Sequence, residues 1–454
     1  MMMPDHDRTA NVSSGGGPDA QAADAAEALL TLDARHVWHP YTQHLHAPTP
    51  IAVARAEGAY LFDAAGRRIL DAISSWWVTL HGHGQPEIAD AIAAQARTLE
   101  QVIFAGCTHE PAVRLAAALA RVAPPGLTRV FFSDDGSTAV EAAVKMALQY
   151  WDNRGTPRRL VAALEHAYHG DTFGAMSVSA RSLFSGPFDR LLFDVARLPD
   201  PSEDADATLA AFDTLLDARG DALAALIVEP LVLGAGGMRT WPEAALGALA
   251  ARCRARGVLL IVDEVMTGFG RTGPLFACQR ADVAPDIMCV SKGITGGFLP
   301  LGATLATEAV FDAFLSDDRR RTLFHGHSYT ANPIACAAAL ASLALLEAPA
   351  SAAARARIEA THRRELPRVA EHPRVRSPRV LGTIAAFEIV AHEQGYLAGV
   401  GRALAAHALA EGVLLRPLGD TCYLLPPYCT SDDDLAHAYA VIAAFLARDD
   451  AAPG

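Results

Sequence analysis

Two carboxylates end an apolar run in the stretch Gly257-Val258-Leu259-Leu260-Ile261-Val262-Asp263-Glu264-Val265. Such a run is typical of a buried strand in a parallel sheet. The next apolar run, residues 286–290, leads into Ser291-Lys292-Gly293. Lys292 lies 292 − 263 = 29 residues after Asp263, which fits neighbouring strands but also other strand orders. Ligands collect at the carboxyl ends of strands in such sheets, so we expect both side chains near a ligand.

Short β-type runs and alanine-rich helical stretches alternate on both sides of this segment. The alternation predicts an α/β fold with a mainly parallel sheet wrapped by helices. Beyond the two runs above, the expected strands lie at residues 130–132, 160–163 and 226–228, and amphipathic helices are expected at 138–151 and 242–256.

The length of 454 residues and a hydrophobic content of 51% predict a large globular protein of two or three domains. Residues 1–25 are poor in apolar side chains and are expected to form a disordered tail. We expect residues 26–75 and 331–454 to form a smaller domain from both chain ends. Residues 76–330 are expected to form the large domain.

The formal charge of −13 and the absence of a long basic block argue against a nucleic-acid partner. The sequence has no apolar run long enough to span a membrane and no secretory signal, so we expect a cytoplasmic protein.

The seven cysteines of the chain are scattered and odd in number, which predicts free thiols. The pairs His81/His83 and His325/His327 stand beside glycines in expected loops, so no metal site is predicted.

The lysine content singles out one nucleophile. Only Lys145 and Lys292 are lysines among 38 basic residues, leaving 38 − 2 = 36 arginines. A guanidinium keeps its charge, whereas an ammonium can lose a proton and attack a carbonyl. Lys145 lies in an expected helix, four residues after Glu141, where an ordinary ion pair is expected. Lys292 is therefore the better candidate, with chance survival of a lysine as the alternative.

Other side chains suit a planar, phosphorylated cofactor. Asp263 can keep a pyridinium nitrogen protonated, although a helix cap or a metal-binding pair with Glu264 would use the same residues. A strand-to-helix turn ends in Gly136 and Ser137, whose amides can face a phosphate while Ser137 caps the helix. Tyr168 follows another strand, where it can stack on a ring or serve only as a core tyrosine.

Two arginines are candidate clamps for a substrate carboxylate. They are Arg271 and Arg416, which stands before Pro417, and a guanidinium can offer a carboxylate two parallel hydrogen bonds. A surface position is the alternative for both.

Together these motifs resemble the class III, ornithine-type aminotransferases of the fold-type I pyridoxal-phosphate enzymes, over nearly the whole chain after residue 30. The motifs are Asp135-Gly136-Ser137, Tyr168-His169-Gly170, Asp263-Glu264-Val265, Thr267-Gly268-Phe269-Gly270-Arg271-Thr272-Gly273, Ser291-Lys292-Gly293 and Tyr329-Thr330-Ala331-Asn332-Pro333. The resemblance implies a seven-stranded sheet, pyridoxal 5′-phosphate held by Lys292 as a Schiff base, and Asp263 at the ring nitrogen. It further implies a homodimer in which Thr330 reaches the neighbouring subunit's cofactor phosphate.

Within the class, further motifs resemble the subgroup that transfers an amino group from S-adenosylmethionine to 8-amino-7-oxononanoate in biotin biosynthesis. They are Trp38-His39-Pro40-Tyr41, Ser74-Ser75-Trp76-Trp77, Gly234-Ala235-Gly236-Gly237 and Arg416-Pro417-Leu418-Gly419. The resemblance implies that Tyr41, Trp76 and Trp77 line the substrate pocket and that Arg416 binds the keto acid's carboxylate. It implies a two-stage transamination with Lys292 as general base and acid.

Two positions depart from the family pattern, and several rival functions remain. Asp135 stands where the phosphate turn commonly has serine, and Leu233 replaces a common glutamine.

The nearer rival is another class III enzyme acting on a diamine or an ω-amino acid. Rivals of other classes are a nucleotide-binding oxidoreductase and a non-catalytic binding module, although no GxGxxG motif follows an early strand.

Overall fold

The computed structural model describes residues 18–392 and 394–448. The first described element is the helix α1, Pro18–His36. Residues 18–25 therefore begin a helix where we expected part of a disordered tail, and residues 1–17 of that expected tail lie outside the described part of the chain.

The large domain is built on a seven-stranded sheet with strand order β4-β12-β11-β10-β7-β5-β6. Strand β12 runs antiparallel to both neighbours, and the other pairs are parallel, so the expected mainly parallel sheet is confirmed. The sequence runs marked five of these strands and missed β6 and β12. The bounds are β4 Leu127–Ser133, β5 Leu160–Leu164, β6 Ala196–Leu198, β7 Leu223–Val228, β10 Leu259–Asp263, β11 Ile287–Val290 and β12 Gly302–Thr307.

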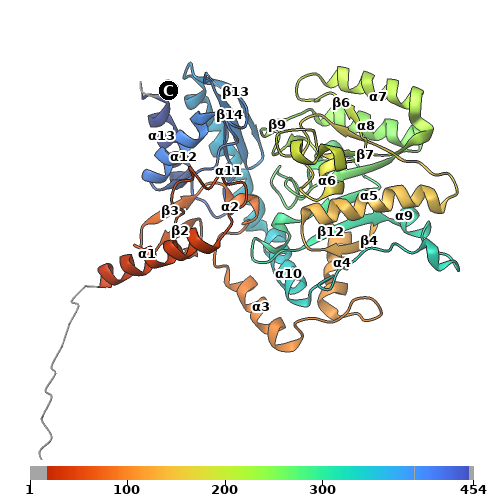
Figure 1. The fold of residues 1–454 in the computed structure, drawn as a ribbon, viewed down its shortest axis with the longest axis horizontal. Coiled ribbons are helices and arrows are strands. Elements are labelled where there is room, and N and C mark those ends of the chain that lie inside the picture. Colours follow the sequence, from red (N-terminus) through yellow and green to blue (C-terminus); the bar gives the residue numbers. More distant parts are fainter. Residues whose placement is uncertain (1–17, 393, 449–454) are drawn as a thin grey trace, which may run out of the picture.

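Helices cover both faces of this sheet because side chains alternate along each strand. On β5, Leu160 and Ala162 pack into one core layer, while Val161 and Ala163 pack into the other. The layer of Val161 includes α5, and the layer of Leu160 includes α4, α7, α8 and α10. These helices surround the sheet in Figure 1; the large-domain helices are α3 Pro86–Thr98, α4 Glu110–Val122, α5 Gly136–Asn153, α6 Phe173–Val178, α7 Ala205–Arg219, α8 Glu243–Arg256, α9 Glu308–Asp312 and α10 Pro333–Glu347.

Segments from the two ends of the chain share one sheet. Strand β15, Val413–Leu414, pairs in parallel with β3, Arg68–Asp71, so C-terminal residues complete an N-terminal sheet. Figure 1 shows the red and blue segments together on one side of the molecule. The other elements here are β1 Val53–Glu57, β2 Tyr60–Asp63, α2 Ser74–Trp77, α11 Pro349–Ala370, β13 Val375–Leu381, β14 Ile384–Ile389, α12 Gly399–Ala410, β16 Thr421–Leu424 and α13 Asp432–Leu446, with the short pair β8 Val232–Leu233 and β9 Arg239–Thr240 near the domain boundary.

The domain boundary that we expect at residue 330 lies directly before helix α10. Helix α10 packs against α3 and α4, and its Ala335, Cys336 and Leu343 belong to the core of the large domain. The smaller domain resumes at α11. Among the described helices, no single one is long and apolar enough to cross a membrane, and the pair α10–α11 that reaches this length is bent by 68°.

Candidate active site

A cavity of about 460 Å³ opens at the carboxyl ends of the central strands. Asp263 ends β10 and Lys292 follows β11, and these two strands are parallel neighbours paired through Asp263 and Cys289. The strand order left open by the sequence is thus settled, and both side chains line one cavity. The lining also includes Trp77, Asp134, Asp135, Gly136, Ser137, Tyr168, His169, Gly170, Glu229, Val265, Met266 and Ser291.

Lys292 lies in an environment that favours a neutral amine. Its φ is 42°, in the left-handed region, at the start of a short 3₁₀ turn, Lys292–Thr295. Nζ lies 5.0 Å from the centre of the Trp77 ring. Burial lowers the pKa of the Lys292 ammonium, opposed by the negative charges of Asp263 and Glu229. A buried amine with a lowered pKa is suited to attack a carbonyl.

Asp263 is fixed in the floor of the cavity by two contacts. Its Oδ2 lies 2.7 Å from Nδ1 of His169, and its Oδ1 accepts a hydrogen bond of 3.0 Å from the amide of Val265. Both side chains are almost completely buried. The carboxylate therefore has a fixed orientation, as required of a group that must face a ligand nitrogen.

Glu229 is a buried site residue that the sequence reasoning missed. It follows β7, and its carboxyl oxygens accept hydrogen bonds from the amides of Tyr168 and Gly234, at 2.8 and 3.0 Å. Burial raises the pKa of Glu229 to about 7, although the nearby His169 acts in the opposite direction. The available signal was its position directly after an apolar strand, the same signal that singled out Asp263.

The phosphate-type turn is present, with a different cap from the one expected. Asp135, not Ser137, is the N-cap of α5, because its carboxylate accepts a 2.8 Å hydrogen bond from the amide of Thr138. The Ser137 hydroxyl instead accepts from the amide of Asp171 at 3.1 Å. Gly136 and Ser137 begin the helix and line the cavity, and the first amides of a helix have no partner within it.

Close backbone approach at this turn depends on glycine. A Cβ at Gly136 would lie 2.6 Å from Val265, and one at Gly170, where φ is +130°, would lie 2.1 Å from the Ser137 hydroxyl. These two glycines keep the turn open toward the cavity.

Tyr168, which lines the cavity, forms a hydrogen-bonded group with Tyr41. The two phenol oxygens are 3.2 Å apart, and Tyr41 donates to Oδ2 of Asp171 at 2.5 Å. Burial, reinforced by these hydrogen bonds, raises the pKa of the Tyr168 phenol. Asp171, which the sequence reasoning passed over, therefore joins the two predicted tyrosines, residues 41 and 168.

The two tryptophans stand on an unusual backbone. All four residues of α2, Ser74–Trp77, have left-handed φ values of 51°, 47°, 81° and 74°. Such a conformation costs a residue other than glycine roughly 1–2 kcal/mol. The ring of Trp76 packs edge-on to Tyr41, with centroids 5.6 Å apart, and lies 4.2 Å from the Arg416 guanidinium carbon. Of the predicted substrate residues, Trp77 lines the cavity, whereas Tyr41 and Arg416 contact its neighbour Trp76.

Arg271 is not a carboxylate clamp. Its side chain is fully buried, and its guanidinium donates to the carbonyls of Pro426, Trp77 and Thr79 at 2.9, 3.2 and 3.4 Å. These bonds connect the end of α2 and the residues that follow it to the segment after β16. The sequence suggested a clamp because it showed an arginine but not that the side chain of this arginine is buried.

The remaining predicted residues lie outside the cavity. Thr330 does not line it; its hydroxyl donates to the carbonyl of His327 at 2.9 Å. Lys145 donates to the carbonyl of Phe324 at 3.2 Å. The expected ion pair between Lys145 and Glu141 is wrong, because Glu141 accepts from the amide of Gly174 at 2.6 Å and helps to hold the start of α6.

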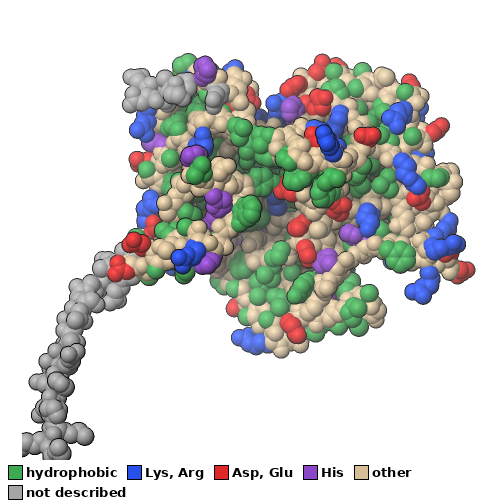
Figure 2. Space-filling view, in the orientation of Figure 1, with side chains coloured by type: hydrophobic (Ala, Val, Ile, Leu, Met, Phe, Trp, Pro, Cys, Tyr) green, Lys and Arg blue, Asp and Glu red, His purple; other side chains and the backbone are tan. Residues whose placement is uncertain are grey.

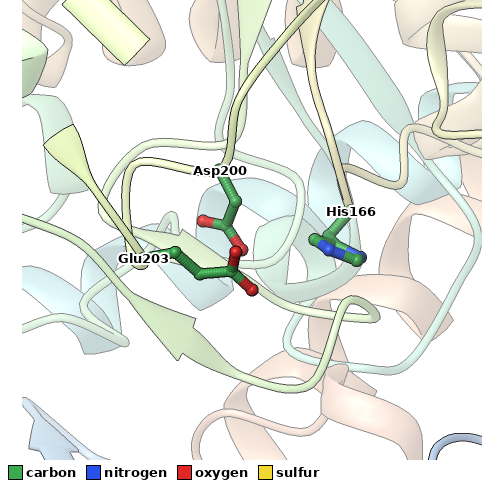
Figure 3. Close-up of side chains that lie close together, drawn as sticks. All are labelled: His166, Asp200 and Glu203. Atoms are coloured by element: carbon green, nitrogen blue, oxygen red, sulfur yellow. The ribbon is translucent and has the colours of Figure 1, made fainter. Parts of the chain in front are cut away.

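One group of side chains has the chemistry of metal ligands. His166, Asp200 and Glu203 converge in Figure 3. The guanidinium of Arg239 already pairs with both carboxylates, at 3.1 Å to Asp200 and 2.6 Å to Glu203. This arginine occupies the place of a cation, so the group is best described as an ion-pair network. The histidines of the pair His81/His83 contact different side chains: His81 contacts Ser342, whereas His83 contacts Asp71.

Comparison with known proteins places these residues in a family. The chain matches the aminotransferase class-III family model over residues 41–446. It is 54% identical to adenosylmethionine-8-amino-7-oxononanoate aminotransferase of Synechococcus elongatus over 90% of this chain and 98% of the relative. The corresponding protein of Geobacter sulfurreducens is 40% identical over 90% of this chain and 95% of the relative.

A solved structure agrees with this match. The crystal structure of adenosylmethionine-8-amino-7-oxononanoate aminotransferase from Methanocaldococcus jannaschii superimposes with a TM-score of 0.89, at 35% identity, covering 92% of this chain and 98% of that one. The expected fold, that of the fold-type I transaminases, is confirmed.

The cavity fits the cofactor of this family, pyridoxal 5′-phosphate. The amine of Lys292 can hold its aldehyde, the carboxylate of Asp263 can face its ring nitrogen, and the amides of Gly136 and Ser137 can receive its phosphate. When bound, the cofactor supplies an electron sink for charge that develops on a substrate carbon. The chain belongs to the class-III aminotransferases and is a pyridoxal-phosphate-dependent transaminase.

Proposed function

We propose that this transaminase transfers the amino group of S-adenosylmethionine to 8-amino-7-oxononanoate, giving 7,8-diaminononanoate for biotin synthesis. The names of the relatives, at up to 54% identity over 90% of the chain, are the main support. The single structural observation that carries the proposal is the stack of Arg416 on Trp76, 4.2 Å from ring centre to guanidinium carbon, beside Tyr41. It offers a carboxylate receptor next to an apolar wall.

The roles of the cavity residues follow from their positions. Lys292 would hold the cofactor and, once freed by the amino donor, carry the proton between the substrate carbon and the cofactor. Asp263 would keep the ring nitrogen protonated, with His169 fixing its orientation. Tyr168 would cover the ring, and Gly136 and Ser137 would bind the phosphate. The aromatic faces of Trp76 and Trp77 suit both an aliphatic chain and a sulfonium cation.

The two substrates are proposed to use one cavity in turn. This order predicts parallel lines in double-reciprocal plots, the pattern of a ping-pong reaction. The test is to mix the purified holoenzyme with S-adenosylmethionine and 8-amino-7-oxononanoate and to identify 7,8-diaminononanoate by mass spectrometry. Equal turnover of unrelated ketones would defeat the assignment.

The nearer rival is a class-III enzyme for a diamine or an ω-amino acid. A panel of amino donors, including putrescine and β-alanine, separates the two functions. The proposal requires S-adenosylmethionine to exceed every other donor in kcat/KM. Preference for a diamine would favour the rival.

We also propose a homodimer in which Thr330 serves the cofactor phosphate of the partner subunit. Thr330 lies outside the cavity of its own chain, and its neighbours Phe324 and Tyr329 expose 72% and 63% of their surface. Figure 2 shows hydrophobic side chains among polar and charged ones on both sides of the central hollow. Large apolar side chains that are exposed close together, such as Phe324 and Tyr329, are typical of a surface that a partner covers.

Complementation tests this arrangement. Lys292→Ala and Thr330→Glu each disable a site, the second by placing a charge near the phosphate. If Thr330 acts in the partner's site, a mixed dimer of the two variants contains one intact site, and co-expression restores activity. Continued inactivity of a mixed dimer confirmed by mass spectrometry would contradict the proposal.

The cytoplasm is the proposed location. All seven cysteines are free, as in proteins of a reducing compartment. Fractionation of cells that express the full chain tests this.

A further inference from the structure

A buried carboxylate outside the cavity accepts hydrogen bonds from the left-handed turn that contains the two tryptophans. Asp71 ends β3 and is fully buried. Its Oδ1 accepts from the amide of Ser75 at 2.9 Å, and its Oδ2 accepts from the Ser75 hydroxyl at 2.8 Å. Nε2 of His83 lies 2.9 Å from the same Oδ2. Both oxygens are thus used, and Ser75 in the middle of the turn is held twice.

The backbone conformation of this turn requires stabilising contacts. Its residues, Ser74–Trp77, include no glycine, yet all four have positive φ. Side chains with a Cβ disfavour this region, so without compensating contacts the segment would relax toward right-handed backbone. Strain of this kind persists only where the surroundings determine the conformation, and it gathers at functional sites.

The conformation of the turn sets the positions of two rings. Trp77 faces Lys292, with Nζ 5.0 Å from its ring centre, and its own Nε1 donates to the Tyr423 hydroxyl at 3.0 Å. Trp76 faces the other way, toward Arg416 and Tyr41. A relaxation at Ser75 would move both rings, because the side-chain directions of neighbouring residues depend on the backbone angles between them.

We propose that Asp71 is a positioning residue for transamination, whose buried carboxylate holds the left-handed turn and so places Trp77 against Lys292 and Trp76 against Arg416. Asp71 does not line the cavity and acts through Ser75. The proposal rests on the aminotransferase activity of the family and on no particular substrate pair.

Asp71→Asn tests the proposal in the purified holoenzyme. An amide of the same size cannot accept hydrogen bonds at both positions. KM for the best amino donor and acceptor of the wild type should rise at least tenfold, with kcat changed less than threefold. The visible absorbance of the cofactor bound at Lys292 should remain. An unchanged KM, within twofold, would overturn the proposal.

A matched control separates positioning from stability. Tyr60 lies on β2, which pairs with β3, and its hydroxyl donates to Asp434 in the first turn of α13. Tyr60→Phe should lower the Tm but leave KM unchanged. If it raises KM as much as Asp71→Asn does, the effect is one of general stability and the proposal fails.

Glycine should rescue the variant. In the double variant Asp71→Asn with Ser75→Gly, residue 75 adopts positive φ without steric cost, so KM should return at least halfway, on a logarithmic scale, toward that of Ser75→Gly alone. No recovery would show that Asp71 does not act through this turn.

A second variant tests the proposal if Asp71→Asn does not fold. Ser75→Ala removes one hydrogen bond to Asp71 and keeps the carboxylate. It should raise KM about threefold, and an unchanged KM would count against the proposal.

Discussion

Nδ1 of His169 lies 2.7 Å from Oδ2 of Asp263, and both side chains are buried beneath the cavity that Lys292 lines. This pair fixes a negative charge where the ring nitrogen of the cofactor would lie. Asp263→Asn keeps the shape and removes the charge, so kcat should fall about 100-fold or more, the scale of losing one aligned electrostatic group. Steady-state turnover of the cofactor-saturated variant measures this.

A neighbouring aspartate provides the control for that measurement. Asp286 is half-buried, and its Oδ2 accepts from the amide of Leu260 at 2.8 Å, at the opposite end of the strands. Asp286→Asn should lower stability and leave kcat within a few-fold. Equal losses of kcat in the two variants would refute a specific role for Asp263.

Glu229 should make stability depend on pH. Its pKa is raised by burial from 4.5 to about 7, so the folded protein holds this proton more tightly than the unfolded chain. The stability it contributes is fully present below pH 4.5 and is lost as pH rises through about 7, by up to roughly 3 kcal/mol. Glu229→Gln should remove this decline. Urea unfolding between pH 4.5 and 8 measures the two slopes, and parallel slopes would contradict the account.

Arg416 should be irreplaceable by lysine. Lysine keeps the charge but loses both the planar stack on Trp76 and the paired donors for a carboxylate. KM for a substrate with a carboxylate should rise about tenfold or more in Arg416→Lys. The exposed Arg402 on α12 serves as the control, since Arg402→Lys should leave KM unchanged. A KM for Arg416→Lys within twofold of the wild type would exclude the proposed receptor.

Arg271 should act through stability. Arg271→Met removes the donors to three buried carbonyls, and each unsatisfied group costs about 1–3 kcal/mol, so the free energy of unfolding should fall by about 3 kcal/mol or more. Chemical denaturation measures this. The variant could instead keep its stability and lose only affinity for carboxylates. That result would contradict this account and identify Arg271 as a substrate clamp.

Strongly periodic and chemically unusual features were predictable from the sequence. The apolar runs before Asp263 and Lys292 were long enough to predict buried strands, and the rarity of lysine singled out Lys292. Strand β12 was not predicted, because a run of alternating small residues does not reveal that it runs antiparallel between β4 and β11. The packing of helix α10 against α3 and α4 was not predicted, because an alanine-rich pattern does not show which neighbours a helix packs against.

The features of the site that were missed or wrongly predicted are ones that the local sequence does not determine. Asp135 and Ser137 are both good helix caps, and only the backbone angles decide that Asp135 is the N-cap. Glu229 was passed over although it directly follows an apolar strand, because no second carboxylate stands beside it as Glu264 stands beside Asp263. The left-handed turn at Ser75 could not be predicted, since a segment without glycine gives no local signal for positive φ.

The central claim is that Lys292 carries the cofactor, and the chain's two lysines make it open to one direct measurement. Borohydride reduction of the yellow holoenzyme, followed by peptide mass spectrometry, should place a single pyridoxyl group on the peptide that contains Lys292 and none on the peptide that contains Lys145. Modification of Lys145 instead, or a reduced holoenzyme with Lys292 unmodified, would contradict the account.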